Sequence, residues 1–338
     1  MNVAAPPARI LVPPVLDDLP RLPDAHAAVR EWSGETMGTR WSVKCAPTGD
    51  VAPTVPLAIQ QALDRIVGQM STWLPSSELS VYNDAAAGRA FTLSAGFATV
   101  LDVALQLARD TGGAYDPSVG ALVDLWGFGP APRRTMPPSS QAIAAASARC
   151  GWRRLDFDAA QGRITQPGGL RLDLSSIAKG YGVDRVCDVL RASGIDHFLV
   201  EIGGELRGHG VKPDGLPWWV DIERTADDAA FTPLRIALHG LAVATSGDAR
   251  RFFDADGTRH SHTIDPRSGR PIDDAVASVT VLHRECLHAD ALATAIAVMG
   301  VADGLAFAER RGLAARLVER RGAQTREHFT TAFAAMLG

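Results

Sequence analysis

Strand-like segments follow one another closely through the second half of the chain, and this spacing limits the possible folds more than any other feature. Segments rich in Val, Ile, Leu and Trp occupy residues 197–204, 217–224, 233–240, 241–247 and 275–282. Short turns separate many of them, whereas parallel neighbours require a long crossover. We therefore expect an α+β fold with mixed, largely antiparallel sheets and flanking helices rather than a doubly wound parallel sheet.

Apolar residues at helical spacing predict helices over residues 55–70 and 95–111, and we expect both helices to cover a sheet. Further helices are expected up to about Ser193 and over residues 289–298. The first clear strand is predicted at residues 39–46. A long Pro-rich connection covers residues 130–140. The domain organisation predicted from these patterns is a Pro-rich surface arm over residues 1–31 and one domain over residues 32–338.

Composition excludes several functional classes. The 338 residues are 46% hydrophobic and carry a formal net charge of −4, so the chain has no basic footprint for long nucleic acid. No segment approaches the roughly 20 apolar residues that a membrane-spanning helix needs. Prolines interrupt the first thirty residues, where a signal peptide needs an apolar run, and we expect a cytoplasmic location. Four scattered cysteines predict buried thiols, without zinc sites or disulfides.

The sequence LRLDLSSIAKGYGVD, residues 170–184, joins a β-prone stretch to a helix. The break falls at Ser175 and Ser176, and the helix carries Lys179 near its start. Free amide groups at a helix start bind anions, and Lys179 adds a mobile positive charge. Asp173 can accept hydrogen bonds at the same place. We expect this joint to bind a phosphate group or a nucleotide.

Asp290 and Thr294 are spaced four residues apart in a predicted helix, so their oxygen atoms share one face. Two such oxygens can bind Mg²⁺. The alternative is structural: Asp290 stabilises the helix start, and Thr294 bonds to a backbone carbonyl. The pattern alone favours the structural alternative.

Residues 259–271, RHSHTIDPRSGRP, contain a candidate general base, His262. Asp265 either orients His262 or caps its own turn, since DPRSG is ordinary turn sequence.

Residues 115–130 place Asp116 before Trp126 and Phe128, which either face an aromatic ligand or belong to the core. The glycine pair in VEIGGEL is a weak signal. Ser246, Asp248 and the arginines that follow either bind phosphate or form a charged surface.

Eight strings in order resemble the ApbE family of FAD:protein FMN transferases: ETMGTRWSV, MSTWLPSSELSVYN, AYDPSVGALVDLWGFG, LDLSSIAKGYGVD, LVEIGGEL, ATSGDARRFF, HSHTIDPRSGRP and ADALATA. The resemblance covers about residues 35–300. It implies an ApbE-like α+β fold and an enzyme that uses Mg²⁺ to cleave FAD. FMN would pass to a Thr or Ser hydroxyl of an acceptor protein, and AMP would leave.

The resemblance also implies roles for individual residues. His262 matches the functional histidine. The implied metal site consists of Ser176, Asp290 and Thr294, with Ser176 contributing either its backbone oxygen or its hydroxyl. The implied FAD-binding residues are Met37, Trp73, Ala114, Tyr115, Asp116, Asp173, Lys179 and Ile264.

Two alternative functions share this residue set. An FAD pyrophosphatase would pass FMN to water, and Asn83 in the family's SxxN stretch does not exclude it. A non-catalytic FAD-binding protein would need an impaired metal site or base, and the intact residues argue against it. The chain departs from the family pattern in lacking a visible lipid-attachment cysteine. It also has Ala293 where one family variant has an acid, so its affinity for the metal could be lower.

Overall fold

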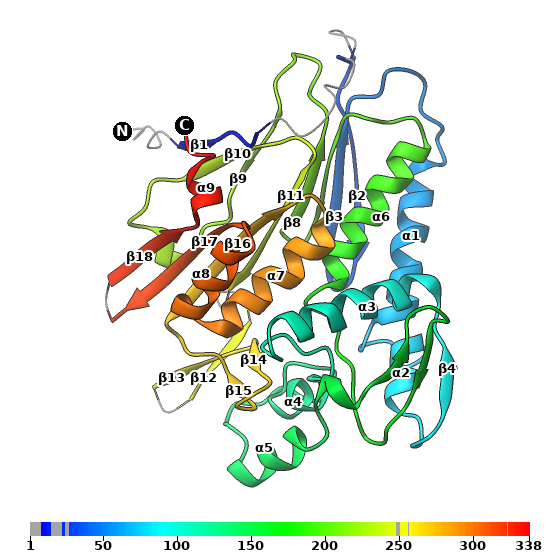
Figure 1. Ribbon diagram of the computed structural model, residues 1–338. Coiled ribbons are helices and arrows are strands. Elements are labelled where there is room, and N and C mark those ends of the chain that lie inside the picture. Colours follow the sequence, from blue (N-terminus) through cyan, green and yellow to red (C-terminus); the bar gives the residue numbers. More distant parts are fainter. Residues whose placement is uncertain (1–7, 15–21, 24–26, 248–250, 256, 323) are drawn as a thin grey trace.

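A computed structural model describes residues 8–14, 22–23, 27–247, 251–255, 257–322 and 324–338 (Figure 1). Its α-helices are α1 Val55–Met70, α2 Glu78–Asn83, α3 Ala95–Asp110, α4 Gly120–Leu125, α5 Ser140–Ser147, α6 Ala178–Ala192, α7 Cys286–Met299, α8 Val301–Arg310 and α9 Thr331–Ala334. The helices expected from apolar spacing are therefore present, and α7 begins three residues before the expected start.

A single large sheet organises the described chain. Its order is β18-β17-β16-β11-β8-β7-β3-β2, and every neighbouring pair is antiparallel. The strands are β2 Arg30–Thr36, β3 Thr39–Cys45, β7 Phe198–Ile202, β8 Glu205–His209, β11 Leu241–Gly247, β16 Val276–His283, β17 Ala314–Arg321 and β18 Gln324–Phe329. The expected α+β class with largely antiparallel sheets is confirmed.

Smaller sheets complete the fold. β1 Arg9–Leu11, β10 Leu234–Leu238 and β9 Trp218–Asp221 form one, and β4 Ala90–Thr92, β6 Arg163–Thr165 and β5 Asp156–Asp158 form another. Two strand pairs are β12 Phe252–Ala255 with β13 Thr258–Ser261, and β14 Ile264–Asp265 with β15 Arg270–Pro271.

The large sheet separates two hydrophobic cores. Successive side chains of a strand point to opposite faces, so Val200 packs under α1 and α6 while its neighbour Leu199 packs toward the sheet β1-β10-β9. Helices α1, α6, α7 and α8 lie along one face (Figure 1). The three layers are thus helices, large sheet and small sheet.

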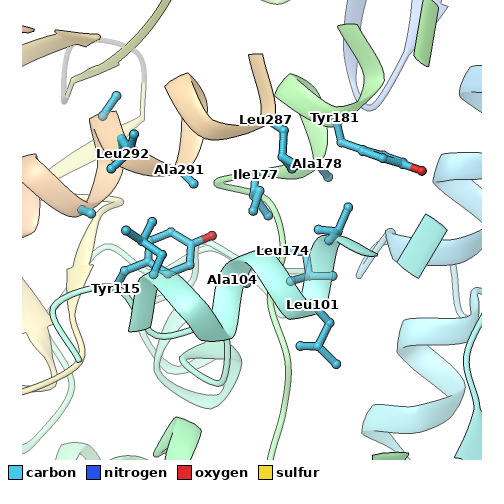
Figure 2. Close-up of a cluster of buried hydrophobic side chains, with 14 of the residues drawn as sticks. Leu101, Ala104, Tyr115, Leu174, Ile177, Ala178, Tyr181, Leu287, Ala291 and Leu292 are labelled. Atoms are coloured by element: carbon cyan, nitrogen blue, oxygen red, sulfur yellow. The ribbon is translucent and has the colours of Figure 1, made fainter. Parts of the chain in front are cut away.

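Helix α3 packs mainly on other helices, and its Leu105 shares a buried cluster with Ile164 of β6 in the small sheet β4-β6-β5. The helix packs on α7 and α1, and its Leu101 and Ala104 belong to the buried cluster that also contains Leu174, Ile177 and Ala291 (Figure 2). This cluster lies beneath the start of α6. The α6 start therefore rests on buried apolar side chains.

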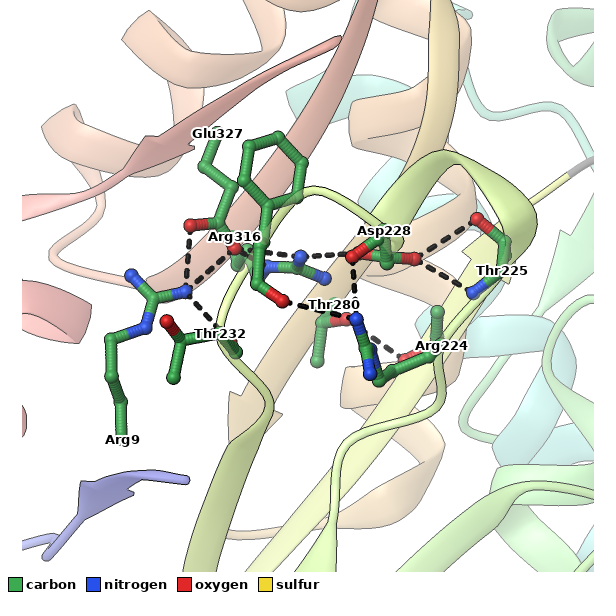
Figure 3. A network of polar contacts seen from close by, with 10 residues as sticks. Arg9, Arg224, Thr225, Asp228, Thr232, Thr280, Arg316 and Glu327 are labelled. Atoms are coloured by element: carbon green, nitrogen blue, oxygen red, sulfur yellow. Dashed lines mark hydrogen bonds and ion pairs between the residues drawn. The ribbon is translucent and has the colours of Figure 1, made fainter. Parts of the chain in front are cut away.

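Part of the expected surface arm belongs to the folded body. β1 pairs in parallel with β10, Leu11 is fully buried, and Arg9 binds both carboxylate oxygens of Glu327 (Figure 3). Glu327 also accepts from the buried Arg316. This network ties the N-terminal strand to β17 and β18. The proposed boundary at residue 32 stays a prediction.

Three further predictions concern residues 170–174, the cysteines and membrane-spanning helices. Residues 170–174 form no strand and contribute only an isolated bridge at Arg171, because Asn83 bonds both backbone groups of Leu172. The four cysteines are free thiols, three buried and one half-buried. No helix among the described residues is long and apolar enough to span a membrane.

Helices α6 and α7 exchange hydrogen bonds between side-chain carboxylates and backbone amides. Asp184 of α6 accepts from the N–H groups of Cys286 and Leu287 at 3.0 and 2.9 Å, at the start of α7. In return, Asp290 of α7 accepts from the N–H of Gly180 at 2.9 Å. The residue before α7, Glu285, makes no side-chain cap bond, so Asp184 supplies that cap from the neighbouring helix.

This exchange requires glycine at position 180. A Cβ there would overlap the carbonyl oxygen of Cys286 and lie 2.8 Å from Cβ of Asp290. Gly180→Ala should therefore lower the free energy of unfolding by about 1–3 kcal/mol, measured by urea titration. The control is Gly68→Ala in α1, where a Cβ has open space and helix propensity predicts a gain of about 0.5–1 kcal/mol. Equal shifts in the two variants would contradict the packing argument.

Candidate functional site

The turn before α6 is built around Asp173. Its Oδ1 accepts from the backbone N–H and the hydroxyl of Ser175, at 2.8 and 2.5 Å. The N–H of Asp173 donates to the carbonyl of Pro117 at 2.8 Å, which joins this turn to the loop after α3. The turn thus places Ser175, Ser176 and Lys179 at one helix start, as the sequence predicted.

Tyr115 connects that loop to the α6 start. The Ser176 hydroxyl donates to the Tyr115 hydroxyl at 3.0 Å. Burial raises the pKa of Tyr115 well above its usual range, and the charges of Asp290, Asp173 and Asp116 raise it further. Tyr115 therefore stays a neutral phenol that can donate a hydrogen bond. Two predicted FAD-binding segments and one predicted metal ligand meet here.

Asp116 has a structural role in its own loop. Its Oδ1 accepts from the backbone and hydroxyl of Ser118, and its Oδ2 accepts from the N–H of Trp152 at 3.1 Å. Burial raises its pKa despite these bonds. Asp116 thereby fixes the loop that carries the buried residues Ala114 and Tyr115.

Lys179 forms an ion pair with Glu205, the first residue of β8. Burial and the charge of Asp290 together raise the pKa of Glu205 to about 7, although Lys179 opposes the shift. Burial likewise raises the pKa of Asp290 against the charge of Lys179. Burial disfavours the Lys179 ammonium, but Asp290 and Glu205 outweigh that effect and raise its pKa. One lysine thus lies among two buried carboxylates.

Sequence reasoning missed Glu205. It stands directly after the glycine pair Gly203 and Gly204, which by itself is a weak nucleotide-binding signal. Both glycines have positive φ, 62° and 109°, and form the tight turn between β7 and β8. The available signal was an acid immediately after such a turn.

The oxygen atoms of this region suit Mg²⁺. Asp290 supplies a carboxylate, and the Thr294 hydroxyl lies 3.0 Å from that of Ser246 on β11. Oε2 of Glu205 is buried and has no hydrogen-bond partner among the described residues. Asp248 and Arg250, which follow Ser246, lie outside the described residues. Among the described residues, no three His, Cys, Asp or Glu side chains are grouped to hold a metal ion. The candidate ligands are still Asp290, Thr294 and Ser176, two of which are hydroxyl residues. Hard oxygen donors with excess negative charge match the preference of Mg²⁺.

His262 is held in one tautomer. Its Nδ1 lies 3.1 Å from the carbonyl oxygen of Arg251, which also accepts from the His262 backbone N–H at 3.1 Å. A carbonyl oxygen only accepts, so Nδ1 carries the proton and Nε2 is the basic nitrogen. Asp265 does not orient His262. It bonds the N–H and guanidinium of Arg267, so the turn alternative is correct.

Aromatic side chains support the histidine segment. Trp126 is buried and donates to the carbonyl of Gly269 at 2.9 Å, so it belongs to the core together with Ile264. Phe128 is half-buried, stacks on Phe253, and meets the His262 ring edge-on at 6.3 Å between centroids. Phe128 therefore supports the general-base candidate.

Met37 and Trp73 complete the predicted FAD-binding set. Met37 has φ 51°, the one positive φ among the described non-glycine residues, in the turn between β2 and β3. A Cβ on Gly182 would lie 3.3 Å from Cε of Met37, so Met37 packs close to α6. Trp73 is 59% exposed in the loop after α1. A large exposed aromatic side chain is available there for stacking.

Comparison with known proteins gives consistent results. The ApbE family model matches residues 37–317. A curated FAD:protein FMN transferase of Vibrio cholerae is 40% identical over 303 residues, which covers 89% of this chain and 90% of the relative. The Escherichia coli K12 FAD:protein FMN transferase is 33% identical, with coverage of 90% and 89%.

Solved structures agree with this result. The flavin transferase ApbE from Vibrio cholerae superposes with a TM-score of 0.86 at 38% identity, covering 92% of this chain and all of that one. The Thermotoga maritima ApbE protein gives a TM-score of 0.79 at 28% identity, with coverage of 92% and 100%. With the model match covering most of the sequence, the chain belongs to the ApbE family.

Proposed function

We propose that this protein is an FAD:protein FMN transferase that uses Mg²⁺ and attaches FMN to a Thr or Ser hydroxyl of an acceptor protein. The observation that carries the proposal is the meeting of Lys179, Asp290 and the Tyr115–Ser176 pair at the start of α6. Cleaving a pyrophosphate requires positive charge near its oxygens. Lys179 and the amides of the α6 start would provide part of that charge, and Mg²⁺ held by Asp290, Thr294 and Ser176 would provide the rest.

Each residue of the site has a distinct task in the proposed reaction. Lys179 and the α6 start counter the charge of the pyrophosphate. Asp290, Thr294 and Ser176 would hold Mg²⁺, which neutralises charge on the phosphate oxygens. Trp73 and Met37 would pack against the flavin ring system.

His262 activates the acceptor. Nε2 takes the proton from the acceptor hydroxyl, while Nδ1 stays bonded to the carbonyl of Arg251. The hydroxyl oxygen then forms a bond to the FMN phosphorus, the bond to the AMP oxygen breaks, and AMP leaves. This tautomer makes Nε2 the nitrogen that can accept the proton.

The direct test incubates the protein with FAD, Mg²⁺ and a candidate acceptor domain, and follows AMP release and acceptor mass together. We expect AMP with a mass gain equal to one FMN residue. AMP with free FMN and an unchanged acceptor would instead identify a pyrophosphatase. Bound FAD without AMP would identify a storage protein.

His262→Ala should slow FMN transfer by about 10²–10⁴-fold, because it removes the general base. The affinity for FAD, measured by fluorescence titration, should stay close to that of the wild type. His328→Ala provides the control, since His328 on the edge strand β18 pairs with Glu319 on the neighbouring strand β17. Equal turnover in His262→Ala and wild type would reject the role of His262.

Asp290→Asn should raise the Mg²⁺ concentration needed for half-maximal activity at least about tenfold, because it deletes an anionic ligand. The asparagine oxygen can still accept from Gly180, so helix packing is retained. Asp303→Asn on the exposed face of α8 is the matched control. A midpoint that Asp290→Asn leaves unmoved would exclude Asp290 from the metal site.

A further inference from the structure

Glu205 is a buried carboxylate, and a buried charge needs a partner of opposite charge. Its side chain is 4% exposed, and it stands at the start of a central strand, fixed by the tight turn through Gly203 and Gly204. One oxygen accepts from Nζ of Lys179. The other is buried with no hydrogen-bond partner among the described residues. A buried carboxylate oxygen without a partner is costly.

Comparison with the other buried ion pairs shows how unusual this one is. Asp184 is also buried, but Arg207 and two backbone amides occupy both its oxygens. Glu327 is shared by Arg9 and Arg316. Those carboxylates are fully bonded, as expected of structural pairs. Glu205 instead shares one lysine with Asp290, and a further oxygen stays available.

We propose that Glu205 is a positioning residue for the transfer reaction, holding the Lys179 ammonium at the start of α6 where it faces the pyrophosphate. This inference rests on the proposed function. A lysine has a long flexible side chain, and an unrestrained ammonium would spend much of its time away from the reacting phosphate. Nζ has three donors, and Glu205 uses one, which leaves two for ligand oxygens.

The test is a double-mutant cycle on AMP release, with Glu205→Gln, Lys179→Met and the double variant. Glutamine keeps the shape and the acceptor oxygen but removes the charge. We expect Glu205→Gln alone to lower kcat by about 10–100-fold. In the Lys179→Met background, the same substitution should change kcat less than about twofold, because the group that Glu205 positions is gone.

Glu327→Gln is the control for loss of a buried carboxylate. Glu327 is 9% exposed and lies in the network with Arg9 and Arg316. This variant should lower Tm while kcat stays within about twofold of the wild type. A merely structural role of Glu205 would give the same result, a lower Tm with unchanged kcat, and would overturn the proposal.

Glu205→Asp covers the case in which Lys179→Met does not fold. It keeps the charge but draws the carboxylate back by one methylene, so positioning predicts a kcat below wild type by about tenfold or more. A wild-type kcat in Glu205→Asp would overturn the positioning role of Glu205 but not the proposed function. Equal effects of Glu205→Gln in both backgrounds would do the same. A wild-type protein that releases no AMP would overturn the proposed function, and this inference with it.

Discussion

The mutual capping of α6 and α7 is the interaction on which the site depends. Asp184 holds the first amides of α7, and Asp290 holds an amide of α6, so each helix fixes the other through a buried carboxylate. Buried carboxylates must be bonded, which leaves little freedom for the two helices to slide. Lys179 lies on one helix, and Asp290 and Thr294 lie on the other. Their relative placement is therefore set by the same bonds that hold the layer together.

Charge is balanced differently in the two ion-pair clusters along these helices. Arg207 neutralises Asp184, and that pair serves packing. A single turn away, Lys179 meets both Glu205 and Asp290, so two carboxylates share one cation. The fold thus concentrates a surplus of negative charge at one point, next to the hydroxyls of Ser176 and Thr294. A divalent cation would balance it.

The sequence predicted the features that depend on local pattern. The apolar pattern predicted α1 and α6. The joint at residues 170–184 pointed to Lys179, and the four-residue spacing to Thr294 pointed to Asp290. The sequence pattern could not locate β1, because three residues among prolines carry no periodic signal and Leu11 is buried by segments far away in the sequence, such as β10 and α9. The sequence pattern also did not point to Glu205, because its partner Lys179 lies on a different element, α6. Trp126 and Asp265 stayed ambiguous because core packing and turn capping use the same residue types as ligand contacts.

The segments of the site are spread along almost the whole chain, from the turn at Met37 to Thr294 on α7. β16 must join the sheet and α7 must pack on it before Asp290 can reach Gly180, so the first two hundred residues alone lack Asp290 and Thr294. During synthesis on the ribosome, the nascent chain therefore brings these segments together only after most of the protein has emerged. The contact between α6 and α7 is therefore made late, when most of the fold is already in place.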